Sequence, residues 1–163
     1  MDLNELMSQI IPPQTKERIY GYSNTDIIDG LSEIERQAVE NALIQSVTTA
    51  GHIDQLAVKT LAYMRSVKAV PALYRLLAIK DNHVSVLITA VAIYQIVSDP
   101  AMIDTGIDAF RKMNDDTLLI LPSFAYLAMF RSEKADDVIR AYINDKEPLV
   151  AYNAQKALER SLA

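Results

Sequence analysis

The chain has 163 residues, of which half are hydrophobic and 23% are charged; it contains no cysteine and has a formal net charge of −5. These values are typical of one soluble globular domain, and the lack of cysteine excludes disulfides, thiolate metal sites and a cysteine nucleophile. The 16 basic residues are scattered, with no run of three. Nucleic-acid binding needs clustered positive charge, so a nucleic acid is not an expected partner.

The N-terminus and the longest apolar stretches both bear on where the protein is located. Met1 is followed by acidic residues, and no basic stretch leads into an apolar segment, so a secretory signal is not expected. The longest apolar-rich windows, residues 84–97 and 118–130, are too short to cross a bilayer as ordinary helices. The expected location is the cytoplasm, without membrane contact.

In chain order, residues 1–31 are predicted to form an irregular N-terminal extension. A short helix is expected within residues 1–11, because Leu3, Leu6 and Ile10 are spaced for one docking face. Pro12-Pro13 ends it, since proline lacks the amide donor. The residues that follow, 14–30, are rich in turn-forming glycine, serine, asparagine and aspartate.

Helices are expected to fill the rest of the chain, residues 32–163. Ser32 and Glu35 have the spacing of a capping box, which predicts a helix that ends before Gly51. Later helices are predicted over residues 54–64, 68–79, 83–97, from Asp99-Pro100 onward, 117–130, 133–143 and 148–162. A bend is expected at Pro122.

The sequence also repeats itself. Leu61-Ala62, Arg65-Ser66 and Lys68-Ala69 recur 66 residues later as Leu127-Ala128, Arg131-Ser132 and Lys134-Ala135. Two units of about 33 residues fit this offset, and that is the length of an antiparallel helix pair in an α-solenoid. The predicted fold is therefore all-α: one domain over residues 1–163, built as a right-handed α-solenoid of about three to four stacked antiparallel helix pairs.

One segment carries a family resemblance. Ala69-Val70-Pro71-Ala72-Leu73, followed by Leu76-Leu77 and Lys80-Asp81, resembles the second helix of a HEAT-type repeat, and Val150-Ala151 with Ala154 and Ala157-Leu158 resembles the first. The resemblance covers roughly residues 54–163 and implies stacked helix pairs. An irregular α-bundle is the alternative.

Catalytic and metal-binding patterns are not found in the sequence. His52 and His83 have no acidic neighbour at metal-binding spacing, and the His-Glu pairs of HEAT-like di-iron hydroxylases are missing. Gly21-Tyr22-Ser23 has only the first half of a nucleophile elbow, and no glycine-rich phosphate loop occurs. We therefore predict no catalytic residue, no metal ligand and no cofactor.

Acidic side chains are the candidates for partner binding. The HEAT resemblance implies that the second helix of each pair lines the concave side, which would align two of the acidic groups as one strip for a basic partner. An ordinary solvated surface is the alternative. The predicted partner-binding residues are Asp26, Asp29 and Glu33; Asp104, Asp108 and Arg111; and Asp136, Asp137 and Arg140.

The function expected from these features is a non-enzymatic module that binds another protein. Small, acidic, cysteine-free HEAT-like proteins resemble immunity proteins that neutralise bacterial toxins, many of which are basic nucleases, so a basic toxin domain is the partner that the resemblance implies. An adaptor in complex assembly would have the same sequence features. The alternative from another class is an enzyme that uses Asp104 and Asp108 as a carboxylate pair.

Overall fold

The computed structural model describes residues 2–13, 21–79 and 81–162, and in these ranges it contains helices and no strand. The all-α prediction is confirmed. In chain order the elements are α1 (Leu3–Ile10), α3 (Thr25–Asp29), α4 (Glu33–Thr49), α5 (Gln55–Tyr63), the 3₁₀ helix η1 (Val67–Ala69), α6 (Val70–Leu76), α7 (His83–Val97), α8 (Ala101–Arg111), α9 (Thr117–Ala128), α10 (Glu133–Arg140) and α11 (Pro148–Leu162).

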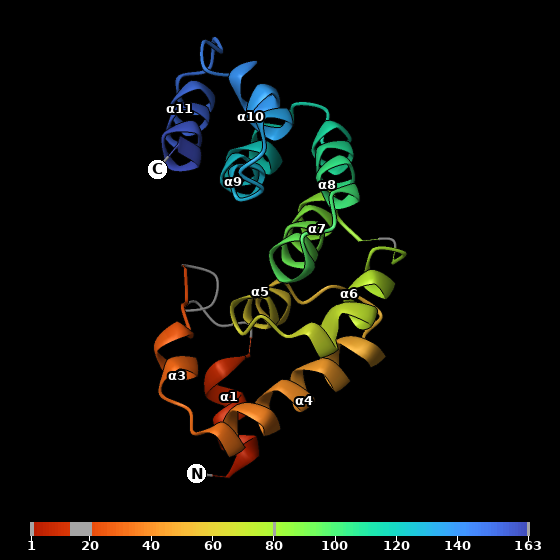
Figure 1. Cartoon of the computed structure of the whole chain (residues 1–163). Coiled ribbons are helices and arrows are strands. Elements are labelled where there is room, and N and C mark those ends of the chain that lie inside the picture. The colour runs from red at the N-terminus through yellow and green to blue at the C-terminus, as the bar shows by residue number, and fades with distance from the viewer. Residues whose placement is uncertain (1, 14–20, 80, 163) are drawn as a thin grey trace.

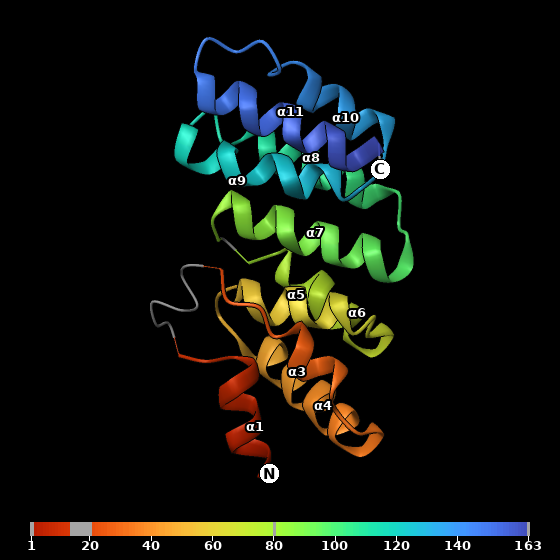
Figure 2. The ribbon, with the colours of Figure 1, turned by 90° about the vertical axis from the view of Figure 1, so that its left-hand side faces the viewer.

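From α5 onward the helices lie in two layers that bend into an arc (Figure 1). Helices α5, α7, α9 and α11 form the inner layer, on the concave side, and α6, α8 and α10 form the outer layer (Figure 2). In the inner layer α7 contacts α5 and α9, and α9 contacts α11. The N-terminal helices α1, α3 and α4 close one end of the arc. Each helix therefore buries its apolar side mainly against its neighbours along the stack.

Left-handed backbone residues recur at intervals of 33 residues. Arg65, Ser98 and Arg131 follow α5, α7 and α9, and all three have left-handed backbone angles, with φ of 53°, 56° and 48°. After α5 the turn is a Schellman motif, because the amide of Arg65 donates to the carbonyl of Ala62 and the amide of Ser66 donates to that of Leu61. The sequence offset of 66 residues thus corresponds to two of these backbone repeats.

Several helix ends agree with the prediction because local chemistry determines them. The capping box is present: the Ser32 hydroxyl accepts from the amide of Glu35, and the Glu35 carboxylate accepts from the amide of Ser32 at 2.9 Å. Hydrogen bonds to the Glu35 carboxylate from the backbone amide of Ser32 and from its side chain lower the pKa of Glu35. Asp54 caps α5 through two backbone amides, and α7 and α11 begin and end at the predicted residues.

Other segments differ from the prediction. The supposedly irregular region contains helix α3, whose Ile28 is buried in the core; residues 14–20 lie outside the described part of the chain. The helix predicted over 68–79 divides into η1 and α6, and its last residues form single turns after Leu76. Helix α9 is continuous through the exposed Pro122.

Candidate functional site

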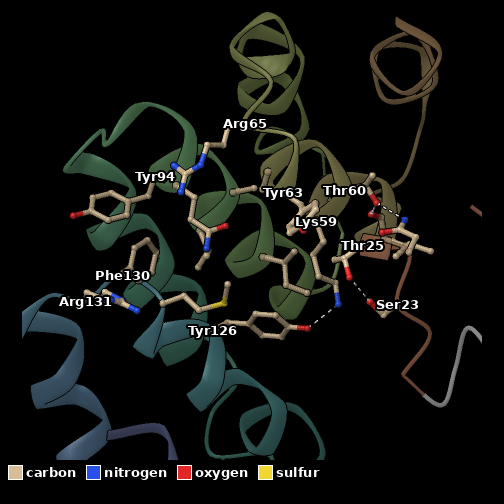
Figure 3. Close-up of a pocket in the computed structure, with 18 of the residues that line it drawn as sticks. Ser23, Thr25, Lys59, Thr60, Tyr63, Arg65, Tyr94, Tyr126, Phe130 and Arg131 are labelled. Atoms are coloured by element: carbon tan, nitrogen blue, oxygen red, sulfur yellow. Dashed lines mark hydrogen bonds between the residues drawn. The ribbon is translucent and has the colours of Figure 1, made fainter. Parts of the chain in front are cut away.

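A groove of about 900 Å³ lies on the inner layer. Its walls come from residues 22–25, from α5, α7 and α9, and from the turns that follow these three helices (Figure 3). The groove therefore spans three successive inner helices, and the left-handed residues Arg65, Ser98 and Arg131 all lie along its wall.

The charged residues that line this groove are all basic. They are Lys59, Arg65 and Arg131, each of them exposed, and no aspartate or glutamate is among the described lining residues. Within the part of the chain that the structure describes, neither arginine side chain has an ion pair or a hydrogen bond. The groove is thus a local region of positive charge on an acidic protein.

Lys59 and Tyr126 link α5 to α9 across the groove (Figure 3). The Lys59 ammonium donates to the Tyr126 hydroxyl at 2.9 Å and lies 5.3 Å from the centre of its ring. This contact holds the two side chains at one end of the groove, beside Ser23 and Thr25. Because its partner is a neutral hydroxyl, the Lys59 charge remains uncompensated.

Aromatic rings supply much of the remaining surface. Tyr94 is half-buried and packs edge-on against Phe130, with ring centres 5.4 Å apart. Tyr63 is 45% exposed and donates from its hydroxyl to both carboxylate oxygens of Asp29, at 2.8 and 2.9 Å. This hydrogen bond raises the pKa of Tyr63, so its hydroxyl stays protonated. Tyrosine rings offer apolar contact area together with a polar group.

Two buried contacts fix the walls. Asn24, which is 4% exposed, donates from Nδ2 to the Ile10 carbonyl at 2.9 Å and to the Thr60 hydroxyl at 2.8 Å, so it ties residues 22–25 to α1 and α5. On the other side Gly106 of α8 leaves room for Phe130: a Cβ at Gly106 would lie 2.6 Å from that ring. The small residue in the outer layer therefore allows an aromatic wall in the inner layer.

Of the acidic residues predicted from the sequence, Asp29 lies next to the groove, where it accepts from the hydroxyl of the lining residue Tyr63, and none of them lines the groove itself. Helices α8 and α10, which carry Asp104, Asp108, Asp136 and Asp137, belong to the outer layer and line no part of the groove. The expectation that these second helices line the concave side is therefore wrong. Residues Asp26 and Asp29 lie on α3, Glu33 begins α4, and Arg111 and Arg140 are in the last turns of α8 and α10.

The outer acidic groups are close to one another but already paired. Asp104 is bonded to Lys134, Asp108 to Lys112 at 2.9 Å, and Asp137 to Arg140. Asp136 is only 7% exposed, and both its carboxylate oxygens are 2.8 Å from the hydroxyl of Ser161. It is therefore part of the packing between α10 and α11 and not part of an open surface.

Sequence reasoning missed the groove residues. Arg65 and Arg131 are the two copies of the repeated Arg-Ser pair, and that recurrence was the available signal. Lys59 and the tyrosines carry no pattern that separates them from other residues on exposed helix faces. His52 and His83 do not line the groove, and no three potential metal ligands lie together in the described residues.

No described helix combines the length and apolar character required to span a bilayer. Comparison of the chain with protein-family models, with curated proteins and with solved structures finds no match in any of the three.

Proposed function

We propose that this protein is a non-enzymatic binding module, built from HEAT-like helix pairs, that holds a partner protein in the groove of its inner layer. The observation that carries the proposal is the groove itself: three basic side chains without a carboxylate among them, next to accessible tyrosines. Arginine and tyrosine contribute most to binding energy at protein interfaces. The 33-residue backbone period supports the repeat architecture.

The acidic outer surface is the less favourable place for the main contact. A basic toxin that docked there would have to replace the ion pairs of Asp104, Asp108 and Asp137 with its own. Exchanging one exposed ion pair for another gains little. The groove needs no such exchange, since its arginines have no partner to give up. Neutralisation of a toxin would then depend on the groove.

Filling the groove tests this function without changing any charge. Gln95 lies on α7 in the middle of the groove wall, and Gln45 is exposed on α4 outside it. We expect Gln95→Trp to abolish capture of the native partner from host extracts, and Gln45→Trp to leave capture intact. Both variants should keep the wild-type circular dichroism and thermal midpoint.

A double variant decides between the groove and the acidic outer surface. Asp104→Asn combined with Asp108→Asn removes outer negative charge and should not affect capture. Capture that survives Gln95→Trp but is lost in this outer double variant would refute the groove and favour the acidic surface. Turnover of a small molecule that is lost in the outer double variant would favour the enzyme alternative.

A further inference from the structure

We infer that the segment bound in the groove is an extended, acidic stretch of the partner, anchored by two carboxylates on Arg65 and Arg131. This inference rests on the proposed function, because it names the chemistry of the ligand for the same groove. It follows from the charge of the lining, from the backbone positions of the two arginines and from their separation.

The lining is positively charged, so it attracts negatively charged groups and repels positively charged ones. Lys59, Arg65 and Arg131 are exposed, and the described lining residues include no carboxylate that would neutralise them. A guanidinium presents several donors in a planar arrangement that matches a carboxylate with two hydrogen bonds. An acidic side chain that enters the groove therefore finds partners that the protein itself does not use.

Both arginines occupy backbone positions that disfavour them. The left-handed residue after a helix is usually glycine, since a Cβ is unfavourable at positive φ. Here φ is 53° at Arg65 and 48° at Arg131, yet each carries a long charged side chain at the groove (Figure 3). Unfavourable backbone positions of this kind are typical of functional sites. Ser98, in the same position between them, is small and leaves the middle of the wall open.

The separation of the arginines sets the spacing of the carboxylates. Arg65 follows α5 and Arg131 follows α9, and α7 lies between these helices. Two helix-to-helix steps of about 8–10 Å would give roughly 16–20 Å along a straight stack, and the concave side of the bend is shorter, since Lys59 of α5 reaches Tyr126 of α9 at 2.9 Å. An extended chain advances about 3.3–3.6 Å per residue, so we expect acidic residues no more than about six positions apart, with apolar or aromatic residues between them to contact Tyr94.

A peptide fits these features better than a nucleic acid. Nucleic-acid affinity comes largely from phosphates that lysine and arginine neutralise, about 6–10 of them in a strongly salt-dependent complex, whereas the groove offers three basic residues. The net charge of −5 also repels a long polyanion. A short acidic segment needs only the local charge of the groove.

Selection from a random peptide library tests the inference. The intact protein and its Arg65→Glu/Arg131→Glu variant would each be used to select from displayed random 12-residue peptides. A matched control, Lys146→Glu/Arg160→Glu, makes the same change of net charge at exposed basic residues that do not line the groove. A 20-nucleotide single strand would be measured alongside by fluorescence anisotropy.

We expect the wild type and the control to enrich peptides with two Asp or Glu residues no more than about six positions apart, and the groove variant to lose this enrichment. The best peptide should bind the groove variant at least about tenfold more weakly, because each exposed ion pair becomes a repulsion of similar size. Equal enrichment by the groove variant, or enriched peptides without excess acidic residues, would overturn the inference but leave the binding function standing.

Two further outcomes separate the remaining possibilities. If no peptide is enriched by the wild type, the proposed binding function of the groove fails together with the inference. If the oligonucleotide binds more tightly than the best peptide and loses affinity in the groove variant, the ligand is a nucleic acid and the acidic peptide is refuted.

Discussion

Replacing Arg65 and Arg131 with glycine is expected to make the protein more stable and its groove weaker in binding. Both residues have positive φ and neither side chain is bonded within the described structure. Glycine accepts this backbone region without steric cost, but it removes the two guanidinium groups. Stability and binding should therefore change in opposite directions.

The size of the gain can be estimated per site. A left-handed backbone costs a residue with Cβ about 1–2 kcal/mol. Glycine returns about 0.4–1 kcal/mol of this by raising the entropy of the unfolded chain, and loss of a positive charge at a helix C-terminus removes about 0.3 kcal/mol more. The central values leave a net gain of about 0.5 kcal/mol per site. The two sites share no partner, so the double variant should gain about 1 kcal/mol, which raises Tm by about 2–4 °C.

Thermal unfolding by circular dichroism measures the first effect, and anisotropy with the best acidic peptide measures the second. Ser98→Gly is the matched control, since Ser98 has the same backbone conformation in the same groove wall but no charge. It should raise Tm and leave peptide affinity unchanged. A double glycine variant that melts below the wild type would refute the backbone argument, and one that binds the peptide as tightly as the wild type would refute the role of the arginines.

Three other perturbations follow from single contacts. Gly106→Ala should lower the free energy of unfolding by about 1–2 kcal/mol, measured by denaturant titration, because its Cβ would overlap Phe130. The control Gly51→Ala, whose Cβ would have nothing within 4 Å, should change it by less than about 0.5 kcal/mol. Equal effects of the two substitutions would refute the contact with Phe130. Asn24→Ala should cost about 1–3 kcal/mol, since two buried hydrogen bonds are lost, and should expose residues 22–25 to proteolysis; unchanged protection would count against this anchor. Burial and the hydrogen bond to Asp115 raise the pKa of Tyr142 to about 12. The contribution of its protonated hydroxyl to the free energy of unfolding is therefore complete below pH 10 and is lost as the pH rises toward 12. The alkaline fall in stability should be shallower in Tyr142→Phe, and an identical pH profile for the two proteins would refute this.

The parts of the fold that the sequence predicted are those that local chemistry determines. The capping box at Ser32, the N-cap at Asp54 and the bounds of α11 all depend on residues within one helical turn of the helix end. Helix α3 was not predicted, because its five residues are too few to show a helical period. It is held instead by tertiary contacts, among them the buried Ile28.

The candidate site was harder to predict because it depends on which layer each helix joins. Composition shows how much charge a helix carries, but the bend of the stack decides whether that charge lies on the concave or the convex side. The HEAT resemblance alone predicts that the helices of Asp104 and Asp136 line the concave side, but these helices, α8 and α10, lie in the outer layer. The position of Asp136 does indicate burial, because it shares the apolar face of α10 with Ala135 and Ile139, both fully buried.

Net charge and groove charge have separate consequences in this protein. The total of −5 covers the whole chain, in which the outer carboxylates of Asp104, Asp108 and Asp137 are paired with lysine or arginine and the basic groove residues have no acidic partner. At physiological ionic strength the Debye length is about 8 Å, which is no more than the distance of about 8–10 Å between packed helices. Exposed charges of the outer layer are therefore largely screened from a ligand in the groove, and such a ligand interacts mainly with Lys59, Arg65 and Arg131. A chain whose composition predicts a basic partner can, for this reason, present a site for an acidic one.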